Sequence, residues 1–320
     1  MSHAVYRFHT FRQYLSEKHP FPVRKVPVDA GFTCPNRDGT RGTGGCLYCD
    51  NRSFSLNSVG TREPLTDQIE KGMSFQRNIY GDCKYILYFQ AFSNTHGPVE
   101  RLKSLYDTVF RYPDMIGLSI GTRPDCIDAD VVGLIDSYAD KLPEVWVELG
   151  LQSIHETTLS RVNRGHTFSE FLRAYKLVRQ SRAKICVHVI AGFPWETREM
   201  MMRTADAMAG LNVDSVKIHH FYVAKDTGFV AEYERGELPV MTLGDYVKLT
   251  ADFLERLPER TSVQRLVGEI RGDYLIAPRW DRAKRAILDL INTELIRRNS
   301  GQGAKPAEPV TRSFPSKTSL

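Results

Sequence analysis

The sequence predicts an α/β protein with six consecutive β/α units and a small C-terminal α/β extension. Short apolar runs rich in β-branched and aromatic residues alternate with amphipathic segments of helical period from about residue 24 to about residue 224. After residue 225 this alternation stops. Six such units with right-handed crossovers form either an open doubly wound sheet or a partial (β/α) barrel. Both architectures place functional residues at the carboxyl ends of the strands.

We expect six strands, each a short and mostly apolar run. They are Arg24–Ala30, Tyr85–Phe92, Met115–Ile120, Val145–Leu151, Lys184–Ala191 and Ser215–Val223. Helical period predicts five helices between them: Pro64–Tyr80, Val99–Tyr112, Asp128–Leu142, Thr167–Arg182 and Thr197–Leu211. Thr167 stands three residues before Glu170, which is the spacing of a capping box and supports a helix start there.

The C-terminal extension is predicted to contain a turn-rich stretch, a helix, a strand and a second helix. Their ranges are Tyr233–Val240, Leu243–Leu257, Val263–Ile270 and Asp281–Arg298. The last 21 residues hold three prolines and almost no large apolar side chains, so burial there cannot offset the entropy of ordering the chain. We therefore expect an N-terminal segment at 1–16, a core at 17–258, an extension packed on the core at 259–299 and a disordered tail at 300–320.

Composition points to a globular protein outside the membrane. Of the 320 residues, 42% are hydrophobic and 25% are charged, which is ordinary for a chain with a buried core. No run approaches the roughly 20 apolar residues of a membrane helix, and the first residues lack a secretory signal, so we expect a cytoplasmic location. The net charge of +5 permits nucleic-acid binding without predicting it.

Three of the six cysteines lie in one glycine-rich loop directly after the first predicted strand. Cys34 is followed by eleven residues, then by Cys46, two more residues and Cys49. A CxxC pair lets two thiolates reach one metal centre from a tight turn, and the third cysteine can fold back onto it. A disulfide framework is not expected in a reducing compartment.

Two kinds of metal centre fit this spacing. A structural zinc site needs a fourth ligand, for which His9, His19 or His96 is available. An iron–sulfur cluster with three protein thiolates instead leaves one iron open to a small molecule. The zinc site would stabilise the fold, whereas the iron–sulfur cluster would take part in a reaction.

The loop Cys34-x11-Cys46-Leu47-Tyr48-Cys49, placed after the first strand of a β/α core, resembles the radical S-adenosylmethionine (SAM) superfamily. The segments FTCPNRDGTRGTGGCLYC, YFQAFSNT, SIGTRPDCI, ELGLQS and VNRGH are similar to the YhcC group, which is close to the catalytic subunit of elongator, over about residues 15 to 285. The resemblance implies a partial (β/α)6 TIM-like barrel. It also implies a 4Fe-4S cluster on Cys34, Cys46 and Cys49 whose remaining iron binds SAM.

In that superfamily a reductant such as flavodoxin or ferredoxin drives the cleavage of SAM, and the resulting radical abstracts hydrogen from a substrate. The resemblance therefore implies a radical SAM enzyme. Its similarity to elongator suggests an RNA substrate such as tRNA, with a small metabolite or a peptide as alternatives. Two other functions remain open, a noncatalytic zinc-binding nucleic-acid module and an iron–sulfur electron carrier.

The resemblance also implies residues that contact SAM. Gln152 lies near the end of ELGLQS, and Arg164 follows twelve residues later in VNRGH. This spacing is similar to that of oxygen-independent coproporphyrinogen dehydrogenases, in which the pair contacts SAM. A guanidinium suits the methionine carboxylate, although an ordinary salt bridge would also explain Arg164. Arg123 lies just after the third predicted strand in GTRPD, where relatives often carry an acid in place of Gly121.

Two further cofactor candidates lie within predicted strands. Glu148 is an acid in an otherwise apolar run and needs a partner when buried, either SAM or a structural cation. His188 is expected to contact SAM or to be a satisfied core histidine.

At the end of the sixth predicted strand, a polar group is suited to substrate contact, proton delivery or simple lining. It consists of Lys217, His219, His220 and Tyr222. The other cysteines, Cys83, Cys126 and Cys186, are expected on opposite rims of the core and predict no second cluster.

Overall fold

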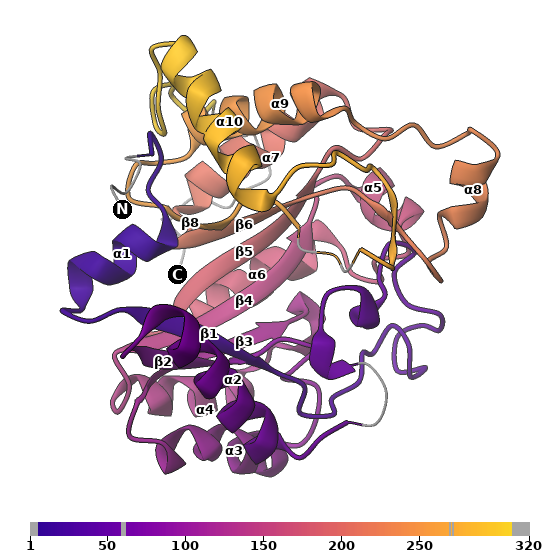
Figure 1. The fold of residues 1–320 in the computed structure, drawn as a ribbon. Coiled ribbons are helices and arrows are strands. Elements are labelled where there is room, and N and C mark those ends of the chain that lie inside the picture. The colour runs from indigo at the N-terminus through magenta and orange to yellow at the C-terminus, as the bar shows by residue number, and fades with distance from the viewer. Residues whose placement is uncertain (1–5, 59–61, 269, 271, 309–320) are drawn as a thin grey trace, which may run out of the picture.

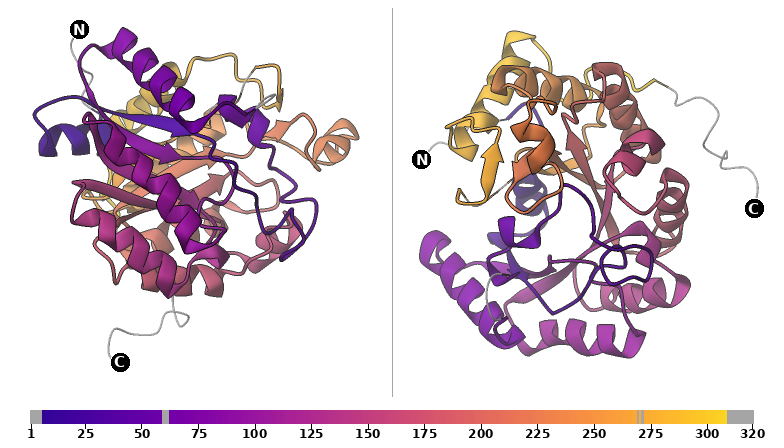
Figure 2. Two further views of the ribbon diagram at one scale, coloured as in Figure 1. Left: turned by 90° about the horizontal axis from the view of Figure 1, so that it is seen from below. Right: turned by 90° about the vertical axis from the view of Figure 1, so that its right-hand side faces the viewer.

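A computed structural model describes residues 6–58, 62–268, 270 and 272–308 of the chain. A seven-stranded parallel sheet forms its centre, in the order β1-β2-β3-β4-β5-β6-β8. The strands are β1 (Val23–Val28), β2 (Lys84–Phe89), β3 (Met115–Thr122), β4 (Glu144–Gln152), β5 (Lys184–Ala191), β6 (Ser215–His220) and β8 (Ser262–Arg265). The sheet curls into a half-barrel (Figures 1 and 2).

The described residues form ten α-helices, most of which cover the outer face of this sheet, as Figure 2 shows in the view along the strands. The short helix Val230–Glu234 instead lies apart from the sheet, beyond the carboxyl ends of its strands (Figure 1). The ten helices are α1 (Phe11–Lys18), α2 (Leu65–Tyr80), α3 (Val99–Tyr106), α4 (Ala129–Ala139), α5 (Glu156–Arg161), α6 (Phe168–Val178), α7 (Arg198–Leu211), α8 (Val230–Glu234), α9 (Leu243–Arg256) and α10 (Lys284–Arg297). A small antiparallel pair, β7 (Val223–Ala224) with β9 (Leu275–Ala277), lies outside the main sheet. Helix layers on parallel strands explain why β2, β3 and β4 are buried almost throughout.

The partial barrel expected from the family resemblance is confirmed, and the six predicted strands all form. The capping box at Thr167 and Glu170 is present at the start of α6. No helix within the described ranges is long and apolar enough to cross a membrane.

Two details differ from expectation. The strand predicted at Val263–Ile270 is the shorter β8, and it pairs in parallel with β6, so it adds a seventh strand to the sheet. Residues 300–308, the first part of the tail predicted as disordered, contact the core, since Gln302 is buried and donates to the carbonyls of Pro258 and Thr261 at 2.6 and 2.7 Å. The rest of that prediction, from 309 onward, lies outside the described residues.

The segment between β1 and α2, residues 29–64, is the structural feature that positions the functional site. It carries the three clustered cysteines and includes two short 3-10 turns, at Asn51–Ser53 and Leu56–Ser58. In Figures 1 and 2 it runs across the carboxyl ends of the strands. The cysteines therefore stand over the end of the barrel at which parallel β/α proteins carry their chemistry.

Close strand packing makes Gly117 of β3 sensitive to substitution. A Cβ at this position would lie 2.5 Å from the carbonyl oxygen of Glu144 on the neighbouring strand. We expect Gly117→Ala to lower the free energy of unfolding by about 1–3 kcal/mol, because the backbone of β4 has to shift. Urea denaturation followed by circular dichroism measures this loss.

Gly133 in α4 is the matched control, since a Cβ there would meet nothing within 4 Å. Gly133→Ala should raise the free energy of unfolding by about 0.5–1 kcal/mol, because alanine favours a helix interior over glycine. Equal effects of the two substitutions would contradict the close packing of β3 against β4.

Candidate active site

A cavity opens at the carboxyl ends of the strands, between the barrel and the segment that carries the cysteines. All eight residues predicted for metal and cofactor binding line it: Cys34, Cys46, Cys49, Arg123, Glu148, Gln152, Arg164 and His188. The structure thus brings together residues that are spread over 155 positions of sequence, from 34 to 188.

The loop around the cysteines is fixed by its own backbone. The amide of Cys49 donates to the carbonyl of Cys46 at 3.0 Å, which closes the CxxC turn. Gly45 has a φ of +78°, a conformation that favours glycine, and a Cβ there would lie 2.6 Å from the Arg37 side chain. Arg37 in turn donates to the carbonyl of Cys49.

Contacts with the segment after α5 anchor the same loop to the barrel. The amide of Leu47 donates to the carbonyl of Val162 at 3.0 Å. The Asn163 side chain donates to the carbonyl of Gly45 at 2.8 Å, and Asn36 donates to the carbonyl of Asn163 at 2.6 Å. These crossed hydrogen bonds hold Cys46 at a defined distance from the ends of β3 and β4.

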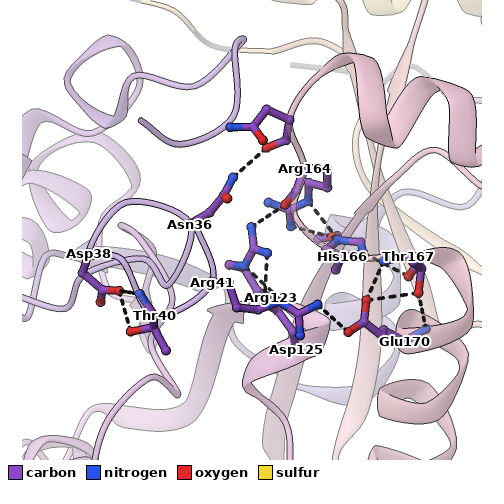
Figure 3. A network of polar contacts seen from close by, with 12 residues as sticks. Asn36, Asp38, Thr40, Arg41, Arg123, Asp125, Arg164, His166, Thr167 and Glu170 are labelled. Atoms are coloured by element: carbon purple, nitrogen blue, oxygen red, sulfur yellow. Dashed lines mark hydrogen bonds and ion pairs between the residues drawn. The ribbon is translucent and has the colours of Figure 1, made fainter. Parts of the chain in front are cut away.

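Buried arginines set the electrostatics on this side of the cavity (Figure 3). Arg164 donates through Nη1 to Cys46 Sγ at 3.5 Å, through Nη2 to the carbonyl of Gly150 at 2.7 Å and through Nε to His166 at 2.9 Å. Arg123 forms two hydrogen bonds with Asp125, at 2.9 and 3.0 Å, and a third with the carbonyl of Arg164 at 2.8 Å. Both guanidinium groups are therefore engaged by the protein.

His166 accepts from Arg164 because it is neutral. Burial, together with the charges of Arg164 and Arg123, lowers the pKa of His166 to about 3. Nε2 accepts from the Arg164 guanidinium, so the proton is on Nδ1, which lies 3.1 Å from the carbonyl of Thr167. Nε2 also lies 3.1 Å from the carbonyl of Gly150, which accepts from Arg164 as well. The imidazole thus orients the arginine that contacts Cys46.

The cysteines differ in how readily they ionise. Burial opposes ionisation of Cys46, but the adjacent Arg164 guanidinium outweighs it and lowers the pKa of this thiol. Burial raises the pKa of Cys49 to about 11, with the neighbouring cysteines adding to the effect. Metal ligation requires thiolates, so the positive charge of Arg164 favours ligation by Cys46.

The three cysteines lie along the wall of the same cavity. Among the described residues, no group of three or more His, Cys, Asp and Glu side chains is arranged to hold one metal ion. The three thiolates of a 4Fe-4S cluster bind three different irons, so they need not converge on one point. The three cysteines nevertheless line one cavity, which is what a cluster requires.

Glu148 lies at the floor of the cavity and is fully enclosed by donors. Its carboxylate accepts from Lys25 and Lys217, from Ser119 at 2.7 Å and from His188 Nε2 at 2.8 Å. Burial alone would raise the pKa of Glu148, but Lys217 and Lys25 hold it well below its usual value. The partner that this buried acid needs is therefore a pair of lysines.

Gln152 differs from the other cofactor candidates because its side-chain amide has no protein partner within the described part of the chain. It follows a register shift between β4 and β5 and has a φ of +77°. Phe92, another residue of the cavity wall, also has a positive φ, of 63°. Such backbone conformations are costly for residues other than glycine and cluster at functional sites.

The polar group predicted at the end of β6 is also at the cavity. Lys217, His219, His220 and Tyr222 all line it, and the His219 ring lies 5.6 Å from that of His188. Cys126 does not line it, and burial raises the pKa of this thiol to about 12, which leaves it unreactive.

Sequence reasoning missed three residues of this site. Lys25 comes from β1, Arg265 from the end of β8, and Arg37 from the cysteine loop. The available signal for Lys25 was a charged residue inside a predicted strand, but the neighbouring Arg24 gives the same signal without reaching the site. The position of Arg265 depends on β8 joining the sheet, which was not expected.

Comparison with known proteins gives matches along most of the chain. The model of the Radical SAM superfamily matches residues 37–208, and that of the Radical_SAM C-terminal domain matches residues 213–297. The chain is 40% identical to protein YtqA of Bacillus subtilis, over 94% of each protein. It is 35% identical to YhcC of Escherichia coli, over 83% of this chain and 85% of that one.

The more distant matches are to longer proteins, of which this chain covers only a part. A tRNA uridine(34) acetyltransferase of Methanocaldococcus infernus is 26% identical over 50% of this chain and 30% of that protein. The solved structure of the archaeal Methanocaldococcus infernus Elp3 has a TM-score of 0.66 at 17% identity and covers 88% of this chain and 64% of that one. The comparison with this solved structure shows similarity of fold.

The buried charges around Glu148 predict a large stability effect. In Glu148→Gln, two lysines would remain in the barrel without a counter-charge, so the free energy of unfolding should fall by about 3–5 kcal/mol. The exposed pair of Glu237 and Arg235 is the control, because Glu237→Gln should change the value by less than about 1 kcal/mol. Urea denaturation at pH 7 compares the two variants.

The difference in unfolding free energy between wild type and Glu148→Gln should depend on pH. Because the pKa of Glu148 is lower in the folded protein than its unfolded value of about 4.3, its contribution is complete above that pH and is lost as the pH falls through the folded pKa. The difference between wild type and Glu148→Gln should therefore shrink below about pH 4. A constant difference down to pH 2 would show that Glu148 is not ionised in the fold.

Proposed function

Because the chain belongs to the radical SAM superfamily, we propose that it holds a 4Fe-4S cluster on Cys34, Cys46 and Cys49 and binds SAM in the cavity beside them. The observation that carries this proposal is that the three cysteines line one cavity together with the buried arginines. When bound, these cofactors supply the reductive cleavage of SAM and hydrogen abstraction from a substrate. The protein supplies their placement.

Several residues of the chain would prepare the cluster site. Arg164 stabilises the thiolate of Cys46 by charge and by an N–H···S contact of 3.5 Å. His166, neutral because it is buried, keeps the guanidinium in this orientation. Cys46 itself is buried, which limits access of water to this ligand.

The hydrogen bonds divide the predicted cofactor residues into two groups. Gln152 faces the cavity with a side-chain amide that makes no hydrogen bond to the described residues, so it is the direct contact for SAM. Arg123, Arg164, Glu148 and His188 already bond to protein atoms. They act as positioning residues that set the shape and charge of the same cavity.

For the substrate we propose an RNA such as tRNA. The support is the sequence similarity to a tRNA uridine(34) acetyltransferase across half of this chain. The net charge of +5 is compatible with a polyanionic partner. The reductant would be a small electron carrier such as flavodoxin or ferredoxin.

The geometry does not favour the other functions. None of His9, His19 and His96, the histidines available as a fourth zinc ligand, lines the cavity with the cysteines. An electron carrier does not need a cavity with ionisable residues beside its cluster.

Removing any one of the three cluster ligands should abolish iron binding. We expect Cys34→Ala, Cys46→Ala and Cys49→Ala each to hold much less than the about four irons per chain of the reconstituted wild type. Cys83→Ala is the control, because Cys83 is equally a buried thiol but lies at the opposite end of β2. Iron and sulfide are measured after anaerobic reconstitution, and full iron content in the three variants would overturn the ligand assignment.

An RNA substrate should increase productive SAM cleavage. We expect tRNA from cells that lack this protein to raise the yield of 5′-deoxyadenosine from the dithionite-reduced enzyme several-fold over the RNA-free reaction. The same tRNA hydrolysed by ribonuclease is the control and should not do so. Equal stimulation by the hydrolysed sample would indicate a small molecule, and stimulation by neither would also reject tRNA.

A further inference from the structure

Two side-chain nitrogens approach the sulfur of Cys46, which is buried in the wall of the cavity. Arg164 donates through Nη1 to Sγ at 3.5 Å, and Asn36 donates through Nδ2 to the same atom at 3.8 Å. Both donors are themselves buried, with exposed fractions of 6% for Arg164 and 1% for Asn36. Burial keeps water from competing with these N–H···S contacts.

The orientation of the Asn36 amide follows from its other contact. The carbonyl oxygen of Asn163 can only accept, so the Asn36 atom that lies 2.6 Å from it is the nitrogen Nδ2. A primary amide has two N–H groups, and the second one remains for the sulfur of Cys46. The amide oxygen faces Gly42 and Gly165 instead, where a Cβ would lie 2.6 and 2.7 Å from it. Glycine at these two positions therefore leaves room for this orientation.

The charge of Arg164 is not cancelled by a carboxylate. Its other two side-chain contacts are a backbone carbonyl and the imidazole of His166, which is neutral. No Asp or Glu in the described part of the chain forms an ion pair with Arg164, whereas Arg123 is paired with Asp125 at 2.9 Å. The positive charge of Arg164 therefore acts on the sulfur of Cys46.

Donors of this kind affect how easily an iron–sulfur cluster is reduced. Reduction adds one electron, and the added negative charge is shared by the irons and their sulfur ligands. A hydrogen bond or a positive charge at a ligand sulfur stabilises the reduced form more than the oxidised form, so it raises the reduction potential. The effect is larger at a buried site, because water does not screen the charge there.

We propose that Arg164 and Asn36 raise the reduction potential of the cluster by donating hydrogen bonds to the sulfur of Cys46. This inference rests on the proposed function, because it takes Cys46 to be a cluster ligand. The cluster gains one electron, and the flavodoxin or ferredoxin that supplies it is oxidised by one electron. No proton moves, because both side chains keep their hydrogens in both states. With both contacts in place, a weaker reductant is sufficient to reduce the cluster.

The test measures the midpoint potential of the reconstituted, SAM-free cluster in a redox titration followed by electron paramagnetic resonance. At the wild-type midpoint, Arg164→Gln should lower the ratio of reduced to oxidised cluster about tenfold, because it removes a charge and a donor. A tenfold change in this ratio corresponds to about 59 mV for a one-electron couple. Asn36→Ala removes a longer and neutral hydrogen bond, so it should lower the ratio about threefold.

Asn163→Gly is the matched control, because it loosens the same loop without changing a contact to sulfur. It removes the 2.8 Å hydrogen bond from the Asn163 side chain to the Gly45 carbonyl and keeps the carbonyl that Asn36 contacts. Asn163 has a φ of +50°, which glycine adopts readily. The potential of this variant should stay close to that of the wild type. Equal shifts in Asn36→Ala and Asn163→Gly, or no shift in Arg164→Gln, would overturn the proposal.

A measurement on the wild-type sequence does not depend on the variants taking up iron. Protein that carries ¹⁵N only in its arginine side chains is reconstituted and reduced without SAM. Pulsed electron paramagnetic resonance should then detect a ¹⁵N coupling to the reduced cluster, transmitted through the contact of Arg164 with Cys46. The coupling should persist in Arg37→Lys, because the hydrogen bond of Arg37 is to the Cys49 carbonyl. Absence of the coupling in the wild type, or its loss in Arg37→Lys, would contradict the proposal.

The outcome is separable from that of the proposed function. Iron content and the response of the cluster signal to SAM are measured on the same wild-type preparation. A SAM-responsive cluster whose potential is the same in wild type, Arg164→Gln and Asn36→Ala would reject only the role of these two donors. Absence of a cluster from the wild-type protein would reject the function itself.

Discussion

One buried guanidinium connects the two halves of the site. Arg164 bonds at once to Cys46 of the cysteine loop, to the Gly150 carbonyl at the end of β4 and to His166. The cysteines lie in a long loop without regular secondary structure, so hydrogen bonds between this loop and the barrel are needed to place them. The cost of burying the charge is offset by the carbonyl, the imidazole and the thiolate that it contacts. The geometry of the cluster site therefore depends on it.

The interior of the barrel also buries a charged side chain among its hydrogen-bond partners, but there the buried charge is negative. Glu148 is buried as an anion because two lysines, a serine and a histidine surround it. Arg123 and Arg164 therefore lie on the cysteine side of the cavity, and the ion pair of Glu148 with Lys217 lies at its floor. A molecule that enters the cavity meets the cysteines and arginines on one side and this ion pair on the other.

Local sequence patterns were sufficient for the strands and most helices. The family resemblance supplied the eight metal and cofactor candidates, and all eight line the cavity because parallel strands bring their carboxyl ends to one edge. The partners of those residues were not predictable. Glu148 is 123 positions from Lys25 and 69 from Lys217, and no local pattern encodes such a pairing. The strand β8 has only four residues, too few for its period to assign it to the main sheet.

The central claim is that the three cysteines hold a cluster to which SAM binds directly. The most direct test is low-temperature electron paramagnetic resonance of the anaerobically reconstituted and reduced protein, recorded with and without SAM. We predict about four irons per chain and a reduced-cluster signal whose g-values shift when SAM is added. Zinc in place of iron, or a cluster signal that does not respond to SAM, would contradict the claim.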